Sequence, residues 1–357
     1  MRIHARGLSL IELLVAMTIG SLLLVATVYV YSQTRKTHTV TEEIARLQEN
    51  GRYIFSVLEP DIQLAGYYGF SNYPGDLKYI KGGSTATVVP AADLVPDKDD
   101  VLGIASSVSC GKNFMVNVLA AIESSNGKYD LGCAAEATAG GALDGPDTLT
   151  IRRSTIPPAD GVGKEAANTV QVLVSRLSPS SQFILTDGVL PPEPELKKDL
   201  VQVRDLVVRS YYIAKDSTNP TAKGMPALRV KTLVSGPRFV DEEVMRGVED
   251  IQFQFGIDTG SYDGNAAIDP GLDENGDGVP DVTRGIATHY VNPGSIPAGA
   301  QVVSVRVWVL LRAEQVDLGY KDVEARSYAD RVIPAPNDGY RRVLMSRTIQ
   351  LRNSRQF

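Results

Sequence analysis

The chain has 357 residues, of which 43% are hydrophobic, so it can form a long helix and one large or two modest domains. Its formal net charge is −6. An acidic chain has no general electrostatic attraction to nucleic acid, so we expect no nucleic-acid partner.

The first element is an apolar run from Leu8 to Tyr31 that contains one charged residue, Glu12. The uncharged residues 13–31 supply about the 20 apolar positions that cross a hydrocarbon layer of about 30 Å, so we expect a transmembrane segment over about residues 10–31. No small-residue cleavage site of a secretory signal peptide follows the run. A plain anchor leaves Glu12 unexplained, because a charged residue at a membrane-helix centre costs about 2.5–3.5 kcal/mol.

The stretch Gly7-Leu8-Ser9-Leu10-Ile11-Glu12-Leu13 resembles the class III leader of type IV pilins and pseudopilins. In that superfamily a prepilin peptidase cuts after the Gly, methylates the new N-terminus and leaves Glu as the fifth mature residue. Leu8 and Ser9 replace the usual Phe and Thr. The resemblance implies that residues 1–7 are a leader and that cleavage falls between Gly7 and Leu8.

The resemblance also implies a role for Glu12. In an assembled filament the Glu12 carboxylate of one subunit can meet the N-terminal ammonium of another. A buried charge is tolerated when it is paired. Loss of Arg2 and Arg6 with the leader would change the net charge from −6 to −8.

The helix is predicted to continue beyond the apolar run, over residues 8–58 and for about 75 Å at 1.5 Å per residue. Pro60 predicts a stop or kink just before it. The apolar residues that recur at helical spacing on one face are Ile44, Leu47, Gly51, Ile54, Phe55 and Leu58.

After the helix, Leu64-Ala65-Gly66-Tyr67-Tyr68-Gly69 resembles the PilW group of minor pilins. The stretches 145–151, 247–256 and 349–353 resemble the same group. The resemblance implies an α+β, pilin-like fold, in which the long N-terminal helix carries a β-rich periplasmic or extracellular domain over residues 59–357.

The two cysteines, Cys110 and Cys133, lie in a segment from about residue 82 to 145 that lacks clear periodicity. We interpret this segment as an insertion or subdomain. Because the bulk of such a chain is exported and the count is even, we expect a disulfide between them. It would contribute about 3 kcal/mol in the chain-entropy model.

Alternating residues predict strands farther along the chain. The clearest alternation joins Val303, Val305, Val307, Val309 and Leu311. Four other stretches read similarly: Val201 to Ile213, Leu228 to Val234, Ile251 to Ile257 and Val343 to Leu351. Near the C-terminus we interpret Arg341, Arg342, Arg347 and Arg352 as solvated side chains.

One loop has the spacing of calcium ligands. Asp273, Asn275, Asp277, the carbonyl of Val279 and Asp281 occupy loop positions 1, 3, 5, 7 and 9, and Gly278 occupies position 6. Arg284 stands where an EF-hand has its bidentate Glu, so a structural Ca²⁺ site is expected instead of an EF-hand switch. Asp258, Asp263 or Asp269 would complete the ligand shell. The alternative is an acidic surface turn.

Sequence motifs of catalysis are absent. The histidines are His4, His38 and His289, and none of them stands in a nucleophile or zinc pattern. There is no G-x-S-x-G elbow. We therefore expect no enzyme and, apart from calcium, no cofactor.

These observations predict a minor pilin that takes part in type IV pilus assembly, in priming, tip-complex formation or both. The expected partners are other minor pilins, the major pilin, the prepilin peptidase and a large tip adhesin. The chain would lie in the inner membrane as a single-pass protein before it enters the pilus at the cell surface. Two alternatives remain, a minor pseudopilin of type II secretion and a calcium-dependent adhesion or binding module.

Overall fold

The structure is a computed structural model, which describes residues 9–69, 77–80, 89–90, 110–111, 113–156, 166–175, 183–185, 201–258, 287–297 and 300–353. Contacts within the chain divide it into two compact units, Met1–Glu49 and Asn50–Phe357. A long helix is followed by antiparallel sheets, which confirms the predicted α+β, pilin-like fold.

Helix α1 spans Leu10–Gln63 and contains 54 residues. Among the described residues it is the helix that is long and apolar enough to cross a membrane, judged by length and composition alone. Its C-terminal end differs from the prediction, because the helix continues through Pro60 to Gln63 instead of ending near Leu58.

Local packing explains why Pro60 does not end α1. Proline cannot donate the hydrogen bond to the carbonyl four residues earlier, that of Ser56, but the helix continues for only three residues beyond Pro60. Leu58 and Ile62 on either side of it are fully buried. The N–H of Leu64 donates to the Pro60 carbonyl at 3.1 Å and closes the turn.

The larger sheet has nine strands in the order β2-β1-β6-β5-β7-β4-β3, and β8 pairs with both β7 and β9. The long strand β7 lies at its centre, because it pairs with β5, β4 and β8 along successive parts of its length. The strands are β1 (Lys78–Ile80), β2 (Val89–Pro90), β3 (Ile122–Ser125), β4 (Thr148–Ser154), β5 (Gln171–Ser175), β6 (Phe183–Leu185), β7 (Val201–Ala214), β8 (Ala227–Val234) and β9 (Arg238–Arg246).

The smaller sheet has four antiparallel strands in the order β11-β10-β12-β15. Its strands are β10 (Val248–Asp258), β11 (His289–Val291), β12 (Gln301–Val316) and β15 (Tyr340–Gln350), and a separate hairpin is formed by β13 (Arg326–Tyr328) and β14 (Arg331–Ile333). Gly247 joins the two sheets between β9 and β10 at a φ of 78°, where a Cβ would lie 2.8 Å from the Arg312 carbonyl oxygen. Only glycine fits such a site without strain.

Alternation located five of these strands, since β7, β8, β10, β12 and β15 cover the predicted stretches. Alternation missed β9, whose sequence is rich in acidic residues. Those acids lie opposite cations on β8, where Lys231 pairs with Asp241 at 2.8 Å and Arg229 pairs with the same residue at 2.7 Å. Such cross-strand pairs allow a charged strand to join a sheet.

The segment predicted as an insertion is in part a component of the main sheet. Its described residues include β3, which pairs with β4 along Ile122–Ser125. The short helices η3 (Phe114–Val116) and η4 (Ala137–Ala139) lie on either side of β3 in the chain. The insertion or subdomain over about residues 82–145 stays a prediction, and β3 is a part of it that pairs with the main sheet. The lack of periodicity reflects short elements with long connections.

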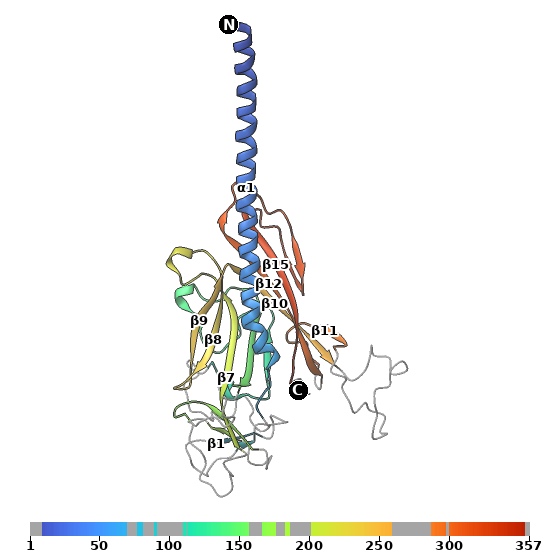
Figure 1. Cartoon of the computed structure of the whole chain (residues 1–357). Helices are drawn as coiled ribbons and strands as arrows, with labels where there is room; N and C mark the ends of the chain where they lie inside the picture. Colours follow the sequence, from blue (N-terminus) through green and yellow to red (C-terminus); the bar gives the residue numbers. More distant parts are fainter. Residues whose placement is uncertain are drawn as a thin grey trace, which may run out of the picture. The chain divides into compact units, whose positions relative to one another are not determined.

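The part of α1 that belongs to the second unit packs on the smaller sheet, and Figure 1 shows β10, β12 and β15 running alongside it. A Cβ added at Gly51 would lie 2.1 Å from the sulfur of Met345 in β15 and 3.2 Å from Leu311 in β12. Glycine at this position therefore lets the helix backbone approach the sheet closely. Glu59 pairs with Arg347 of β15 at 2.8 Å.

Asp61 attaches the end of α1 to the larger sheet. Its carboxylate is 1% exposed. Oδ1 accepts hydrogen bonds from Nε and Nη2 of Arg153 in β4, at 3.1 and 2.9 Å. Oδ2 accepts from Arg209 at 3.0 Å and from the Tyr211 hydroxyl at 2.6 Å, both in β7. A buried charge with this many donors is stable in place, but its loss would leave two arginines without a counter-charge.

The two acids near the end of α1 therefore differ in their predicted effect on stability. We expect Asp61→Ala to lower the free energy of unfolding by about 3–5 kcal/mol, because it breaks a buried ion pair. The matched variant Glu59→Ala removes a pair at the solvent-exposed rim and should cost at most about 1 kcal/mol. Chemical unfolding of the mature protein in detergent measures both values. Equal losses for the two variants would contradict the assignment of Asp61 as the anchor.

Candidate functional site

The N-terminus of α1 forms a capping box. Ser9 precedes the helix, and its N–H donates to Oε2 of Glu12 at 2.9 Å, while the N–H of Glu12 donates to the Ser9 hydroxyl at 3.2 Å. This reciprocal pair satisfies two backbone donors that the first turn leaves without partners. Glu12 thus has a local role in the single chain, and the Ser-x-x-Glu spacing is the signal for it that the sequence analysis missed.

The apolar part of α1 exposes large side chains along its length, including Leu22, Leu24 and Val25. Its hydroxyl groups turn back onto the helix, as Thr18, Ser21, Thr27 and Thr34 donate to carbonyls three or four residues earlier at 2.8–2.9 Å. In lipid every polar group must find an internal partner. These four hydroxyl groups are therefore compatible with burial in a membrane or in an apolar filament core.

Some predicted site residues lie outside the described residues. These are Gly7 and Leu8 at the predicted cleavage site and all of the predicted calcium ligands, 273–281. Asp258, one of the three acids expected to complete the calcium shell, ends β10 and is buried. Within the described ranges, no cluster of three or more acidic, histidine or cysteine side chains is arranged to hold a metal ion.

Cys110 and Cys133 form a disulfide, as predicted, with their Cα atoms 4.1 Å apart. The bond joins the chain just before η3 to the loop that follows β3. The carbonyl of Cys133 also accepts a hydrogen bond from the Tyr129 hydroxyl at 2.8 Å. Neither cysteine is a free thiol, so neither serves as a nucleophile or metal ligand.

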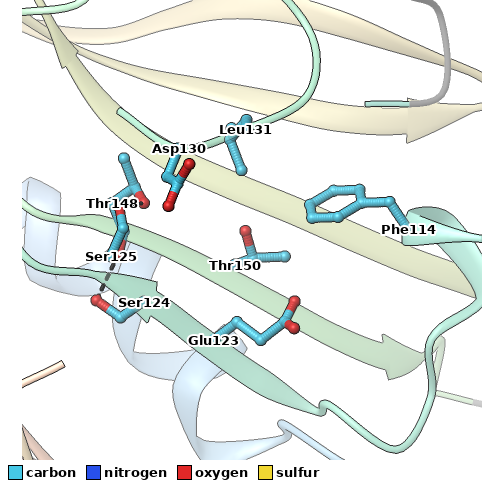
Figure 2. Close-up of a pocket in the computed structure, with 8 residues that line it drawn as sticks. All are labelled: Phe114, Glu123, Ser124, Ser125, Asp130, Leu131, Thr148 and Thr150. Atoms are coloured by element: carbon cyan, nitrogen blue, oxygen red, sulfur yellow. Dashed lines mark hydrogen bonds between the residues drawn. The ribbon is translucent and has the colours of Figure 1, made fainter. Parts of the chain in front are cut away.

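A pocket of about 260 Å³ is lined in part by residues that lie close in sequence to the two cysteines. Figure 2 shows the side chains that line it, with Phe114 and Leu131 toward one side and polar groups around the rest. The lining residues are Phe114, Glu123, Ser124, Ser125, Asp130, Leu131, Thr148 and Thr150. The pocket was not foreseen, because its walls come from segments that no local pattern brings together.

Asp147 joins the two sheets. Its carboxylate accepts the N–H of Gly127 at 2.8 Å and the N–H of Phe253 in β10 at 2.9 Å. Its own N–H donates to the Ile251 carbonyl at 2.9 Å. Burial raises the pKa of Asp147 from 3.8 to about 7, although the two backbone N–H groups oppose that shift.

Asp250 holds the β13–β14 hairpin against β10. It is 1% exposed and accepts hydrogen bonds from the Tyr328 hydroxyl at 2.6 Å, from Arg331 at 3.0 Å and from the Gln252 amide at 3.0 Å. Burial raises the pKa of Asp250, while Tyr328 and Arg331 act in the opposite direction. These contacts explain how a hairpin of two three-residue strands stays in place.

The interpretation of the C-terminal arginines as solvated is wrong for Arg342. Its side chain is 4% exposed and pairs with Glu249 at 2.6 Å, with Asp338 at 2.7 Å and with Asp322 at 3.2 Å. Its hydrogen bonds lower the pKa of Asp338. Arg341 likewise pairs with Asp317 at 2.7 Å. Asp338 lies only four residues before Arg342, but Glu249, Asp322 and Asp317 are 20 or more residues away from the arginines they pair with, so the pattern of the strand alone did not show them.

Arg306 of β12 is held by aromatic rings. Its guanidinium carbon lies 3.9 Å from the ring centre of Tyr290 and 5.7 Å from that of Trp308. All three side chains are partly exposed. Stacking on aromatic rings restrains an arginine side chain, and Trp, Tyr and Arg are enriched where proteins bind one another.

Two family models match the chain. Residues 210–353 match the family described as Type IV Pilus-assembly protein W, and residues 2–28 match the Prokaryotic N-terminal methylation motif. No curated protein and no solved structure is significantly similar to the chain. The first match covers β8 to β15, and the second covers the predicted leader and the start of α1.

The raised pKa of Asp147 makes stability depend on pH. Between 3.8 and about 7, the folded protein holds a proton on Asp147 that the unfolded chain has released. The contribution of this group is therefore present in full below its unfolded pKa and is lost as the pH rises to about 7. We expect the melting temperature of wild type minus that of Asp147→Asn to fall from about pH 5 to about pH 8, because only wild type has a buried group that must release a proton over this range.

The control for this titration is Asp144→Asn, which changes an exposed acid three residues away. The melting temperature of wild type minus that of Asp144→Asn should stay constant over the same pH range. If the melting temperature of wild type minus that of Asp147→Asn stays constant or rises toward neutral pH, the Asp147 pKa is not raised.

Proposed function

We propose that this chain, a type IV pilus minor pilin of the PilW type, joins other minor pilins and the major pilin in a complex that primes pilus assembly and lies near the pilus tip. The family is a structural component of pili, so the proposed mechanism is assembly without catalytic turnover. A large tip adhesin is a further proposed partner.

The observation that carries this proposal is the first part of α1. The methylation-motif match at residues 2–28 includes the first part of the apolar run, and α1 begins there with the capping box of Ser9 and Glu12. Prepilin peptidase would cut after Gly7, and α1 would hold the chain in the inner membrane with the β-rich domain in the periplasm. In the pilus, the same apolar surface would pack against the helices of neighbouring subunits.

In this scheme Glu12 would have one partner in the single chain and gain a second partner in the filament. In the single chain its carboxylate caps the helix through the Ser9 N–H. In the filament the methylated ammonium of a neighbouring subunit would supply the counter-charge that a buried carboxylate needs. A carboxylate has several acceptor sites, so one group can keep the cap and also take the ammonium.

Two variants of Glu12 separate these roles. Glu12→Gln retains a side chain that can cap the helix but has no charge, whereas Glu12→Ala loses both the capping group and the charge. We expect both variants to insert in the membrane, because the apolar run is intact. Their incorporation into the minor-pilin complex should fall to a similar extent, by the equivalent of about 3–5 kcal/mol if the ammonium is fully desolvated.

Co-purification of the other pilins with each variant from membranes measures incorporation. If Glu12→Gln assembles as well as wild type and only Glu12→Ala fails, the cap alone is important and the charge pairing is refuted. A minor pseudopilin of type II secretion is the second candidate, because its subunits carry the same leader. It would be favoured if secretion components co-purified in place of pilus proteins.

A structural calcium ion in the loop 273–281 is a further proposal, supported by the ligand spacing of Asp273, Asn275, Asp277 and Asp281. The loop lacks a Glu at position 12, so the expected dissociation constant is on the order of 10⁻⁴–10⁻³ M, as in extracellular modules. At ten times that concentration, calcium would stabilise the folded chain by about 1.4 kcal/mol.

Thermal unfolding with calcium and with chelator tests this site. Wild type should melt at a higher temperature in calcium, and Asp277→Ala should lose that increase, while the exposed-acid control Asp144→Ala retains it. If all three proteins melt alike in both conditions, the segment is an acidic surface turn. Calcium-dependent adhesion to a surface by the wild-type protein would instead favour a binding module at the pilus tip.

A further inference from the structure

Two of the segments that line the pocket in Figure 2 are joined by the Cys110–Cys133 disulfide, which is close to each of them in sequence. Phe114 begins η3, close after Cys110, and Asp130 and Leu131 come shortly before Cys133. The floor is formed by strands β3 and β4, which supply Glu123 and Thr150. A covalent bond thus fixes the distance between two loop segments that would otherwise depend on weak contacts alone.

The hydroxyl groups on the floor mostly present acceptors to the pocket. Ser124 donates its proton to the Thr148 carbonyl at 2.5 Å, and Ser125 donates to the Lys128 carbonyl at 2.5 Å. The Thr148 hydroxyl lies 2.5 Å from the Ser125 hydroxyl, whose own proton is already used, so Thr148 is the donor of that pair. A ligand in the pocket must therefore bring hydrogen-bond donors.

The two carboxylates of the pocket already have cationic partners. Glu123 pairs with the fully buried Arg152 at 2.5 Å, and Asp130 pairs with Lys128 at 2.9 Å. The site is thus close to neutral, although each carboxylate retains acceptor positions. This balance favours a neutral ligand with several O–H groups over a cation.

The shape and lining indicate a single small ring. Phe114 and Leu131 supply apolar contact on one side, and the carboxylates and hydroxyls supply acceptors on the others (Figure 2). The volume of about 260 Å³ is smaller than the roughly 300–1,000 Å³ of pockets for drug-sized ligands. A pyranose has this character, with an apolar C–H face and O–H donors at its edges.

We propose that this pocket binds one neutral polyhydroxylated ring, such as a monosaccharide unit of a surface glycan. Glu123 and Asp130 accept hydrogen bonds from its hydroxyl groups, and Phe114 and Leu131 contact its C–H face. The disulfide keeps the two walls at the separation that the ring needs. This inference depends on the pocket alone, so it stands whether or not the chain acts at a pilus tip.

The test is calorimetric titration of the full-length mature protein with methyl glycosides of glucose, galactose and mannose. The detergent must lack a sugar headgroup, because such a headgroup would compete for the pocket. We expect at least one glycoside to bind. Asp130→Ala should weaken that binding about tenfold, since a hydrogen bond to a charged group is lost. Asp130 is exposed and pairs only with exposed Lys128 in the described part of the chain, so the variant should fold.

The control Asp144→Ala removes an exposed acid that does not line the pocket and should leave binding unchanged. Reduction of the disulfide should weaken binding as well. Nα-acetyl-lysine amide, whose ε-ammonium group remains free, serves as a cationic probe with an apolar stem. The proposal is overturned if no glycoside binds, if binding is equal in Asp130→Ala and wild type, or if only the cationic probe binds.

Discussion

The buried carboxylate of Asp61 is the interaction on which the arrangement of the second unit depends. A helix that ends at Gln63 and a nine-stranded sheet meet at one side chain, which accepts hydrogen bonds from Arg153, Arg209 and Tyr211. Because these donors come from two adjacent strands, the helix end has one position relative to β4 and β7. Gly51 then permits close packing of the same helix on β12 and β15.

The same physical rule governs the other junctions. Asp147 and Asp250 are also almost fully buried, and each accepts several hydrogen bonds that connect segments far apart in sequence. A buried polar group that lacks a hydrogen-bond partner is destabilising, so these carboxyl groups specify a single arrangement more than they add net stability. The two sheets and the β13–β14 hairpin are thus joined by polar contacts as well as by apolar packing.

Local patterns predicted what depends on local chemistry. The helix, the alternation of β12 and the stretch that resembles a class III leader were visible in the sequence. The disulfide was expected from the even number of cysteines and the expected export of the chain. Long-range pairing was not visible. The charged strand β9 needs Lys231 and Arg229 opposite it, and the burial of Arg342 needs Glu249 and Asp322. The pocket needs the disulfide that joins the segments of Phe114 and Leu131. A single sequence gives no signal for such partners until the fold is known.

The central proposal is that the chain is a pilin whose mature N-terminus is produced by cleavage after Gly7 and methylation of Leu8. Intact-mass analysis of the native protein tests this claim directly. The account predicts a mass lower by the seven residues Met1 to Gly7, higher by one methyl group, and lower by the two hydrogens of the Cys110–Cys133 disulfide. A mature N-terminus at any other position, or an unprocessed chain in cells with active prepilin peptidase, would contradict it.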